Sequence, residues 1–135
     1  KVVVFARFVP EIDSIAKLLQ KKKIGYALIK GDVTDRGEQV EAFQNDPNIK
    51  VFIGNIQSAG VGITLIASDV AIFNSFSWVS GDNLQAEDRI HRLNQKNDVT
   101  IYYQVFLDTF YKEMFDKVRG KQEIIDNIIV SEKNK

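Results

Sequence analysis

The hydrophobic positions of this chain form short continuous runs, separated by longer stretches in which apolar residues recur every three or four positions. The short runs are rich in β-branched and aromatic residues and predict strands covered on both faces, as in a parallel sheet. They occupy residues 2–5, 26–29, 50–53, 70–73 and 99–106. Strands that alternate with helices through short connections predict an α/β fold with right-handed crossovers.

The longer stretches predict amphipathic helices. The first opens at Pro10 and ends before Gly25, and the second has Thr34 as its N-cap and closes at Pro47. A later helix is predicted from Phe110 to Gly120, and the isoleucines at 124, 125, 128 and 129 predict a last one. No apolar run approaches the ~20 residues that span a membrane, so we expect no membrane association.

Composition narrows the possible functions. The chain has 135 residues, which suits one domain over 1–135, and its 18 basic residues balance its 18 acidic ones. The absence of cysteine excludes disulfides, thiolate zinc sites and a cysteine nucleophile. A free-standing nucleic-acid binder usually has a basic excess, so a polyanion site here depends on local placement of charge. The chain starts within a strand pattern, which leads us to expect a piece of a longer polypeptide.

The stretch 85–95 reads Gln-Ala-Glu-Asp-Arg-Ile-His-Arg-Leu-Asn-Gln, and its pattern predicts a helix that ends near Asn94. At about 100° per residue, Gln85, Arg89 and Arg92 share one face, whereas Ala86, Ile90 and Leu93 form an apolar stripe. One side of the helix can therefore pack on a core while two guanidiniums stand free. Each guanidinium is always charged and can bind two phosphate oxygens at once.

This stretch resembles motif VI of the Swi/Snf-type helicase-like ATPases, Gln-Ala-x-x-Arg-x-His-Arg-x-Gly-Gln. The one departure is Asn94 in place of Gly, and Asn also tolerates the left-handed backbone conformation. The resemblance implies that Arg89 and Arg92 are arginine fingers, which act on the γ-phosphate of ATP bound mainly by another lobe, with Gln85 helping to orient it. The alternative is a solvated face on which the arginines pair with neighbouring carboxylates.

A glycine-containing turn over residues 54–65 follows a buried strand, and exposed amides there can cradle a phosphate. The turn resembles motif V of the same family, which touches the nucleic-acid backbone and reaches the nucleotide. Val61 and Thr64 depart from the family's Gly and Asn. By resemblance, Asn55, Gln57 and Ser58 contact nucleic acid, and Gly60 and Gly62 lie at the nucleotide. The alternative is a turn that simply packs tightly under the sheet.

Two more arginines follow strands. Gly31 and Arg36 resemble the family's Gly-x-x-x-x-Arg stretch, and Arg36 falls in a first helical turn, where amides favour a phosphate. Arg7 lies in a stretch that resembles motif IV, another nucleic-acid backbone contact. Arg36 could instead pair with nearby aspartates, and Arg7 could simply be exposed. Trp78 precedes motif VI, and we expect it to anchor its loop rather than to stack on a base.

Ligands of open parallel sheets bind beyond the carboxyl ends of the strands. We therefore expect the site residues at that edge, with the arginine pair at the rim of a cleft beside the strand ends. The opposite wall of the cleft would belong to another piece of polypeptide.

The resemblance covers nearly the whole chain and implies the second RecA-like lobe of a DNA-dependent ATPase, a three-layer sandwich around a mainly parallel sheet. The phosphate loop is missing here and would belong to a first lobe of the same parent chain, which would hold Mg²⁺ and most of the ATP. No metal site is predicted in this lobe. The track would be double-stranded DNA, and the isolated lobe would be inactive.

Two other functions stay open: a non-catalytic module that binds nucleic acid or protein, and a lobe of an unwinding DNA or RNA helicase. Asp88 counts against the second, since such helicases usually have Gly before the first motif VI arginine. The abundance of lysine, isoleucine and asparagine favours a bacterial or phage source and a cytoplasmic location. A eukaryotic source would imply the nucleus.

Overall fold

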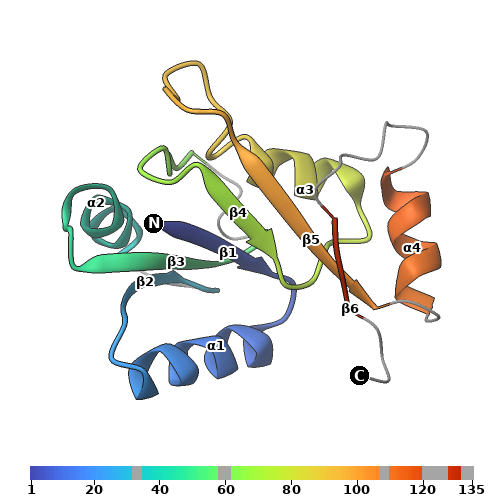
Figure 1. Ribbon diagram of the computed structural model, residues 1–135, viewed down its shortest axis with the longest axis horizontal. Coiled ribbons are helices and arrows are strands. Elements are labelled where there is room, and N and C mark those ends of the chain that lie inside the picture. Colours follow the sequence, from blue (N-terminus) through green and yellow to red (C-terminus); the bar gives the residue numbers. More distant parts are fainter. Residues whose placement is uncertain (32–34, 58–61, 107–109, 120–127, 132–135) are drawn as a thin grey trace.

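The computed structural model describes residues 1–31, 35–57, 62–106, 110–119 and 128–131. Within them, six strands form one sheet in the order β2-β3-β1-β4-β5-β6, and every pair of neighbours is parallel (Figure 1). The strands are β1 Val2–Ala6, β2 Gly25–Ile29, β3 Ile49–Asn55, β4 Val70–Phe73, β5 Thr100–Phe106 and β6 Ile128–Ser131. The helices are α1 Val9–Lys21, α2 Arg36–Asn45, α3 Ser80–Glu87 and α4 Phe110–Arg119.

Two apolar cores flank the sheet, because successive residues of a strand point to opposite faces. Phe52 and Ile53 are consecutive in β3 and are both fully buried, yet they belong to different cores. Helix α1 packs Ile12 and Leu19 against one face, on the side where Figure 1 shows it alone beneath the strands. Helices α2, α3 and α4 bury Phe43, Ala86, Phe115 and Val118 on the other face, and Ile90 in the turn after α3 joins them. The predicted α/β sandwich with a parallel sheet is confirmed.

The chain differs from the sequence-based expectation at its end. The isoleucines at 124–129 predict a helix, but residues 128–131 form β6, which pairs with β5 in register Tyr103↔Ile128, and residues 120–127 lie outside the described part. Paired isoleucines four residues apart fit a helix, and a short apolar run fits a buried strand equally well. The free edge of β5 decides between the two, because a β-branched segment there completes the backbone hydrogen bonding of the sheet.

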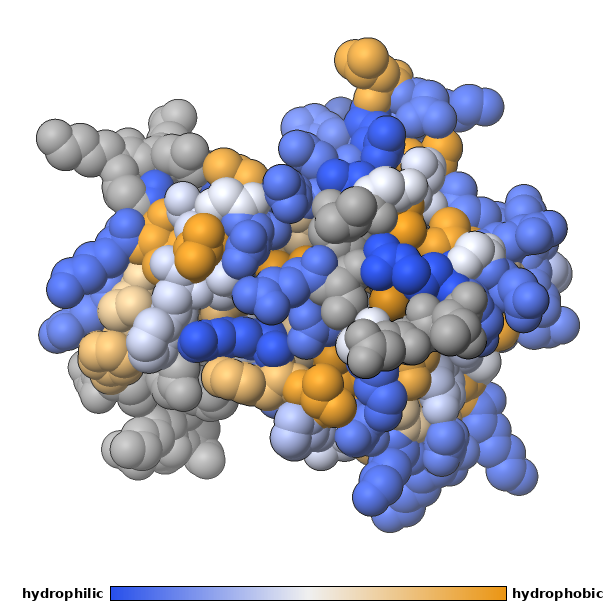
Figure 2. Space-filling model, turned by 180° about the vertical axis from the view of Figure 1, so that it is seen from behind, coloured by the Kyte–Doolittle hydropathy of each residue, from blue (hydrophilic) through white to orange (hydrophobic). Residues whose placement is uncertain are grey.

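The surface carries both hydrophobic and hydrophilic side chains. Seen from behind, hydrophobic and strongly hydrophilic side chains lie next to each other across the middle of the face, and the right-hand rim is mainly hydrophilic (Figure 2). Among the described helices, none combines the length and apolar character that crossing a membrane would require.

Candidate functional site

Helix α3 ends at Glu87, so the helix predicted over residues 85–93 is wrong beyond that residue. The amides of Arg89 and Ile90 bond to the carbonyl three residues back, each at 3.1 Å, which makes a tighter turn. Glu87 and the residue after it are carboxylates placed at the negative end of the helix dipole, with no basic residue in the last turn. The side-chain amide of Gln95 donates to the Ile90 carbonyl at 3.2 Å and so satisfies it outside a helix.

The predicted apolar stripe is only partly buried. Ala86 and Ile90 are fully buried in the core between the sheet and α3, whereas Leu93 is fully exposed. Ile90 therefore anchors the turn, and the two arginines stand on either side of this anchor in the chain.

Both guanidiniums reach the same backbone carbonyl. Nη1 of Arg92 donates to the oxygen of Ile63 at 3.1 Å, and Nη1 of Arg89 lies 3.4 Å from the same atom. Nε of Arg89 also donates to the carbonyl of Gln85 at 3.0 Å, and the amide of Leu65 donates to the carbonyl of Arg89 at 2.8 Å. The segment that follows the glycine turn is thus fastened to the arginine turn, as motifs that share one site would require.

The charges of the pair are not neutralised by a close carboxylate. None of the ion pairs within 4 Å in the described ranges includes Arg89 or Arg92, and Glu87 pairs with Arg119 instead. Burial lowers the pKa of Arg89, and the positive charge of Arg92 lowers it further, while Asp88 opposes the shift. An arginine stays protonated all the same, so the two like charges repel each other, and an anion beside them would relieve this repulsion.

The pair lines a hollow of about 650 Å³. Its walls are Thr64, Asp88, Arg89, His91, Arg92, Leu93 and Asn94. Gln85 is exposed and is not among these residues, so its predicted orienting role rests on resemblance alone. Gly62 lines an adjoining hollow of about 480 Å³ against α2, and its φ of +71° explains why glycine stands there. Ser58 and Gly60 lie outside the described residues.

The arginine hollow is not at the carboxyl edge of the sheet, so that expectation is wrong for this pair. Nε2 of Gln95 donates to the carbonyl of Ser68 at 2.9 Å, and Oγ of Ser68 donates to the carbonyl of Lys1 at 2.8 Å, which places the loop after the arginines near the amino ends of β1 and β4. A crossover helix runs antiparallel to the strands that it connects, so residues after its last turn have returned to the amino side.

The other predicted residues do follow the carboxyl ends of neighbouring strands. Arg7 comes directly after β1, Asn55 is the last residue of β3, and Gly31 and Arg36 follow β2. The side-chain amide of Asn55 donates to the carbonyl of Arg7 at 3.1 Å, and its oxygen accepts the amide of Gln57 at 3.0 Å. Asn55 therefore holds two adjacent strand ends together, and Gly31 adopts the left-handed conformation, with φ +51°. We call these residues the carboxyl-edge row.

Arg7 is packed between aromatic rings. Its guanidinium carbon lies 4.8 Å from the ring centre of Phe8 and 4.5 Å from that of Trp78. Trp78 is 44% exposed and meets the half-exposed ring of Phe110 edge-on at 5.7 Å. Trp78 thus anchors Arg7 and also keeps a free surface, so the expectation that it only anchors its loop is incomplete. A hollow of about 220 Å³ beside Arg7 is lined in part by Glu11, Asn74 and Ser75.

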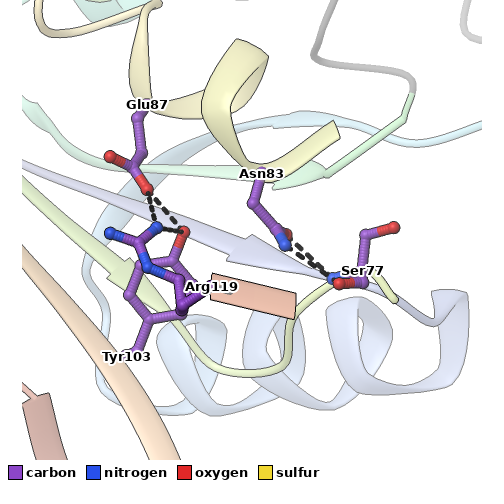
Figure 3. Close-up of polar contacts among 5 residues, drawn as sticks. All are labelled: Ser77, Asn83, Glu87, Tyr103 and Arg119. Atoms are coloured by element: carbon purple, nitrogen blue, oxygen red, sulfur yellow. Dashed lines mark hydrogen bonds and ion pairs between the residues drawn. The ribbon is translucent and has the colours of Figure 1, made fainter. Parts of the chain in front are cut away.

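Buried polar contacts hold α3 in place at both ends (Figure 3). No sequence motif predicts these contacts. At its start, the side-chain amide of Asn83 exchanges two hydrogen bonds of 2.9 Å with the backbone of Ser77. At its end, Glu87 bonds to Tyr103 and Arg119. These partners come from distant positions in the chain, so only the folded structure brings them together.

The part of the chain with described coordinates contains no group of three or more His, Cys, Asp or Glu side chains that could hold a metal ion.

The parallel sheet with helices on both faces defines a RecA-like α/β lobe. A crystal structure titled as the C-terminal part of the Fun30 ATPase domain superposes with a TM-score of 0.83 at 25% identity, over 93% of this chain and 41% of that one.

The sequence model described as "Helicase conserved C-terminal domain" matches residues 1–94. The chain belongs to this family. It is 35% identical over 133 residues to a Caenorhabditis elegans protein named "SWI/SNF-related matrix-associated actin-dependent regulator of chromatin subfamily A-like protein 1 homolog", covering 97% of this chain and 19% of the relative. It is 33% identical over 134 residues to "DNA repair protein rad8" of Schizosaccharomyces pombe, covering 98% of this chain and 12% of the relative.

The chain thus spans less than a fifth of the length of these two relatives. Both relatives are eukaryotic, so they give no support to the predicted bacterial or phage source.

Proposed function

We propose that this chain is the second motor lobe of a DNA-dependent ATPase, and that Arg89 and Arg92 are its arginine fingers. The observation that carries the proposal is the guanidinium pair itself, which faces a hollow of about 650 Å³ and forms no ion pair within 4 Å with any carboxylate that the structure describes. Membership of the helicase C-terminal family supports the assignment, as does the ATPase domain to which the fold is similar.

The residues at the hollow fit a triphosphate. Bound ATP would supply the γ-phosphoryl group whose transfer to water releases the energy used by the motor. Arg89 and Arg92 would bind its terminal oxygens, and their fixed charges would stabilise the charge that develops during transfer. Gln85, Gly60 and Gly62 would complete this side of the nucleotide site. Mg²⁺ and the remaining phosphate contacts would belong to a first lobe of the parent chain, packed against the arginine side.

The carboxyl-edge row would hold the DNA backbone. Arg7 and Arg36 supply positive charge, and Gly31, Asn55, Gln57 and Ser58 supply backbone amides and short polar side chains, which are common partners of phosphate oxygens. The name of the fission-yeast relative, a DNA repair protein, supports DNA as the partner. We propose double-stranded DNA as the track and, from the eukaryotic relatives, the nucleus as the location.

The test is nucleotide turnover by the full-length protein in the presence of double-stranded DNA. Arg89→Ala should abolish turnover and leave ATP binding largely intact, because the first lobe would supply most of the binding. The isolated 135-residue lobe should neither hydrolyse ATP nor bind it tightly. Unchanged turnover in Arg89→Ala would remove the finger assignment and favour a lobe that only binds nucleic acid or protein.

A further inference from the structure

Three buried polar side chains meet at the end of α3, immediately before the arginine turn. They are Glu87, the last residue of α3, Tyr103 in β5, and Arg119, the last residue of α4; they are 8%, 3% and 7% exposed. Figure 3 shows their polar atoms pointing toward one another. We call these three residues the buried triad.

The triad closes a ring of three hydrogen bonds. The hydroxyl of Tyr103 donates to Oε2 of Glu87 at 2.6 Å, and Nη1 of Arg119 donates to the same oxygen at 2.8 Å and to the Tyr103 hydroxyl at 3.2 Å. Burial, and then the Glu87 carboxylate, raise the pKa of Tyr103 far above its usual value, so the hydroxyl remains a donor. The guanidinium also lies over the Tyr103 ring, 4.9 Å from its centre.

Stability alone gives little reason for this ring. The ring of Tyr103 stacks on Phe73 at 4.3 Å and packs against Phe115 at 5.3 Å, so the triad is surrounded by apolar side chains. Replacing a buried ion pair by apolar side chains of similar size is often neutral or stabilising in such a setting. What the charged ring adds is direction, because each bond fixes an angle as well as a distance.

That direction is transmitted to the arginines through the backbone of Glu87. Its carbonyl accepts the amides of Ile90 at 3.1 Å and of His91 at 3.0 Å. These two hydrogen bonds fix the position of the turn that carries both guanidiniums relative to Glu87. A change in the angle of Glu87 would move Arg89, two residues on, relative to the phosphate that it would meet. A misplacement of about 1 Å can lower catalysis on the order of 10²-fold.

We infer that Glu87, Tyr103 and Arg119 are positioning residues, which set the location of Arg89 and Arg92 from β5 and α4. The inference rests on the proposed function, since it assigns a purpose to the placement of the two fingers. It also makes α4, through Arg119, part of the machinery that determines turnover, although α4 contributes no residue to the walls of the arginine hollow.

The experiment compares positioning with stability in the full-length protein, by measuring kcat, KM for ATP and the melting temperature together. The double variant Glu87→Met/Arg119→Met removes both charges at once but leaves the buried Tyr103 hydroxyl without its partners, so it should fold and melt moderately below the wild-type temperature. We expect its kcat to fall on the order of tenfold or more with KM within about twofold, because ATP binding depends on the other lobe. Tyr103→Phe, which leaves the ring in place, should show a smaller fall in kcat of the same kind.

Asp116→Asn is the matched control, because it breaks an exposed ion pair with Lys112 on the same helix and should change neither constant. A double variant that folds and keeps full kcat would overturn the inference. If the double variant does not fold, Tyr103→Phe decides: an unchanged kcat overturns the inference, and a fall in kcat at constant KM supports it. Arg89→Ala is measured alongside, and full turnover in that variant would instead refute the proposed function.

Discussion

The arginine hollow and the carboxyl-edge row hold positive charge in opposite ways. Arg7 in the row lies against two aromatic rings, with its backbone bonded to neighbouring strand ends. Arg89 and Arg92 meet only backbone carbonyls among the partners found for them, and each raises the electrostatic cost of the other. An arginine stacked on rings is stable without a ligand, whereas two that repel are arranged for an anion. This difference is the basis on which we propose separate ligands for the two regions.

The regions also lie at opposite ends of the sheet. The row follows from the topology, because every strand of a parallel sheet ends at the same edge. The arginine hollow lies toward the amino ends because α3 runs back across the sheet. A lobe built in this way can bind one ligand at each end, and a tilt of α3 would be felt at both. In the proposed motor, this connects the nucleotide to the DNA track.

The sharpest test of the comparison is Arg92→Ala in the full-length protein. We expect turnover to fall on the order of 10³-fold, the lower end of the range for arginine fingers, while affinity for DNA is unchanged. Arg92→Lys should recover little, because an ammonium cannot make the bidentate contact of a guanidinium. Turnover and DNA affinity are measured at one salt concentration. A loss of DNA affinity without a loss of turnover would place Arg92 with the row.

Asn83 tests whether α3 supports both regions. Its substitution by alanine leaves the buried amide and carbonyl of Ser77 without partners, which should destabilise the fold by about 2–3 kcal/mol. Urea unfolding monitored by circular dichroism measures the change. Asp82→Ala, which removes a single partly exposed bond to the Ser77 hydroxyl, should have a smaller effect. Equal losses of unfolding free energy in the two variants would show that the buried hydrogen bonds between Asn83 and Ser77 stabilise the fold no more than the exposed one.

Substitution of Arg7 should lower DNA affinity, whereas substitution of Arg92 should lower turnover. Arg7→Ala should weaken DNA binding roughly tenfold or less and lower the slope of log affinity against log salt by about 1, as expected for one lost phosphate contact. Affinity is measured by fluorescence anisotropy at several salt concentrations, with Lys17→Ala at an exposed position of α1 as the control. A lower affinity with an unchanged slope would mean that the aromatic cluster, and not the charge, makes the contact.

The sequence was sufficient for most of the sheet. The five strands that form continuous apolar runs could be predicted because these runs are short and rich in β-branched and aromatic residues, as in strands covered on both faces. The isoleucines that become β6 could not be assigned, because their spacing fits two structures and the open edge of β5 appears only after folding. The end of α3 was missed for a related reason. Leu93 continues the helical period, while the carboxylates at 87 and 88 oppose it.

The candidate site likewise has features that the sequence predicts and features that only the folded structure shows. Motif resemblance picked out Arg89 and Arg92 with their spacing, but not the edge of the sheet at which they lie, because that depends on the direction of a crossover. The buried triad joins positions 87, 103 and 119, and the spacing between them carries no pattern. Only the folded structure shows that Glu87 is buried, and a carboxylate in a core requires a partner.

The smallest effect expected concerns the two glycines with positive φ, one in each region. Gly62, at φ +71°, borders the arginine segment, and Gly31, at φ +51°, belongs to the row; a Cβ at either would meet no atom within 4 Å. Alanine at each should therefore cost only the backbone strain, about 1–2 kcal/mol, and asparagine should cost less. Gly37→Ala at an exposed position of α2 is the matched control and should stabilise the fold slightly, because alanine favours a helix.

The two glycine variants should lose similar stability but differ in which function they lose. Gly62→Ala should lower turnover, because Gly62 precedes the carbonyl that both guanidiniums share, and Gly31→Ala should lower DNA affinity. Each variant is examined well below its melting temperature, so that a folded lobe is compared with a folded lobe. If both glycine variants lowered turnover and DNA affinity alike, the two regions would be a single cooperative site. The separation of ligands drawn from the arginine environments would then have to be abandoned.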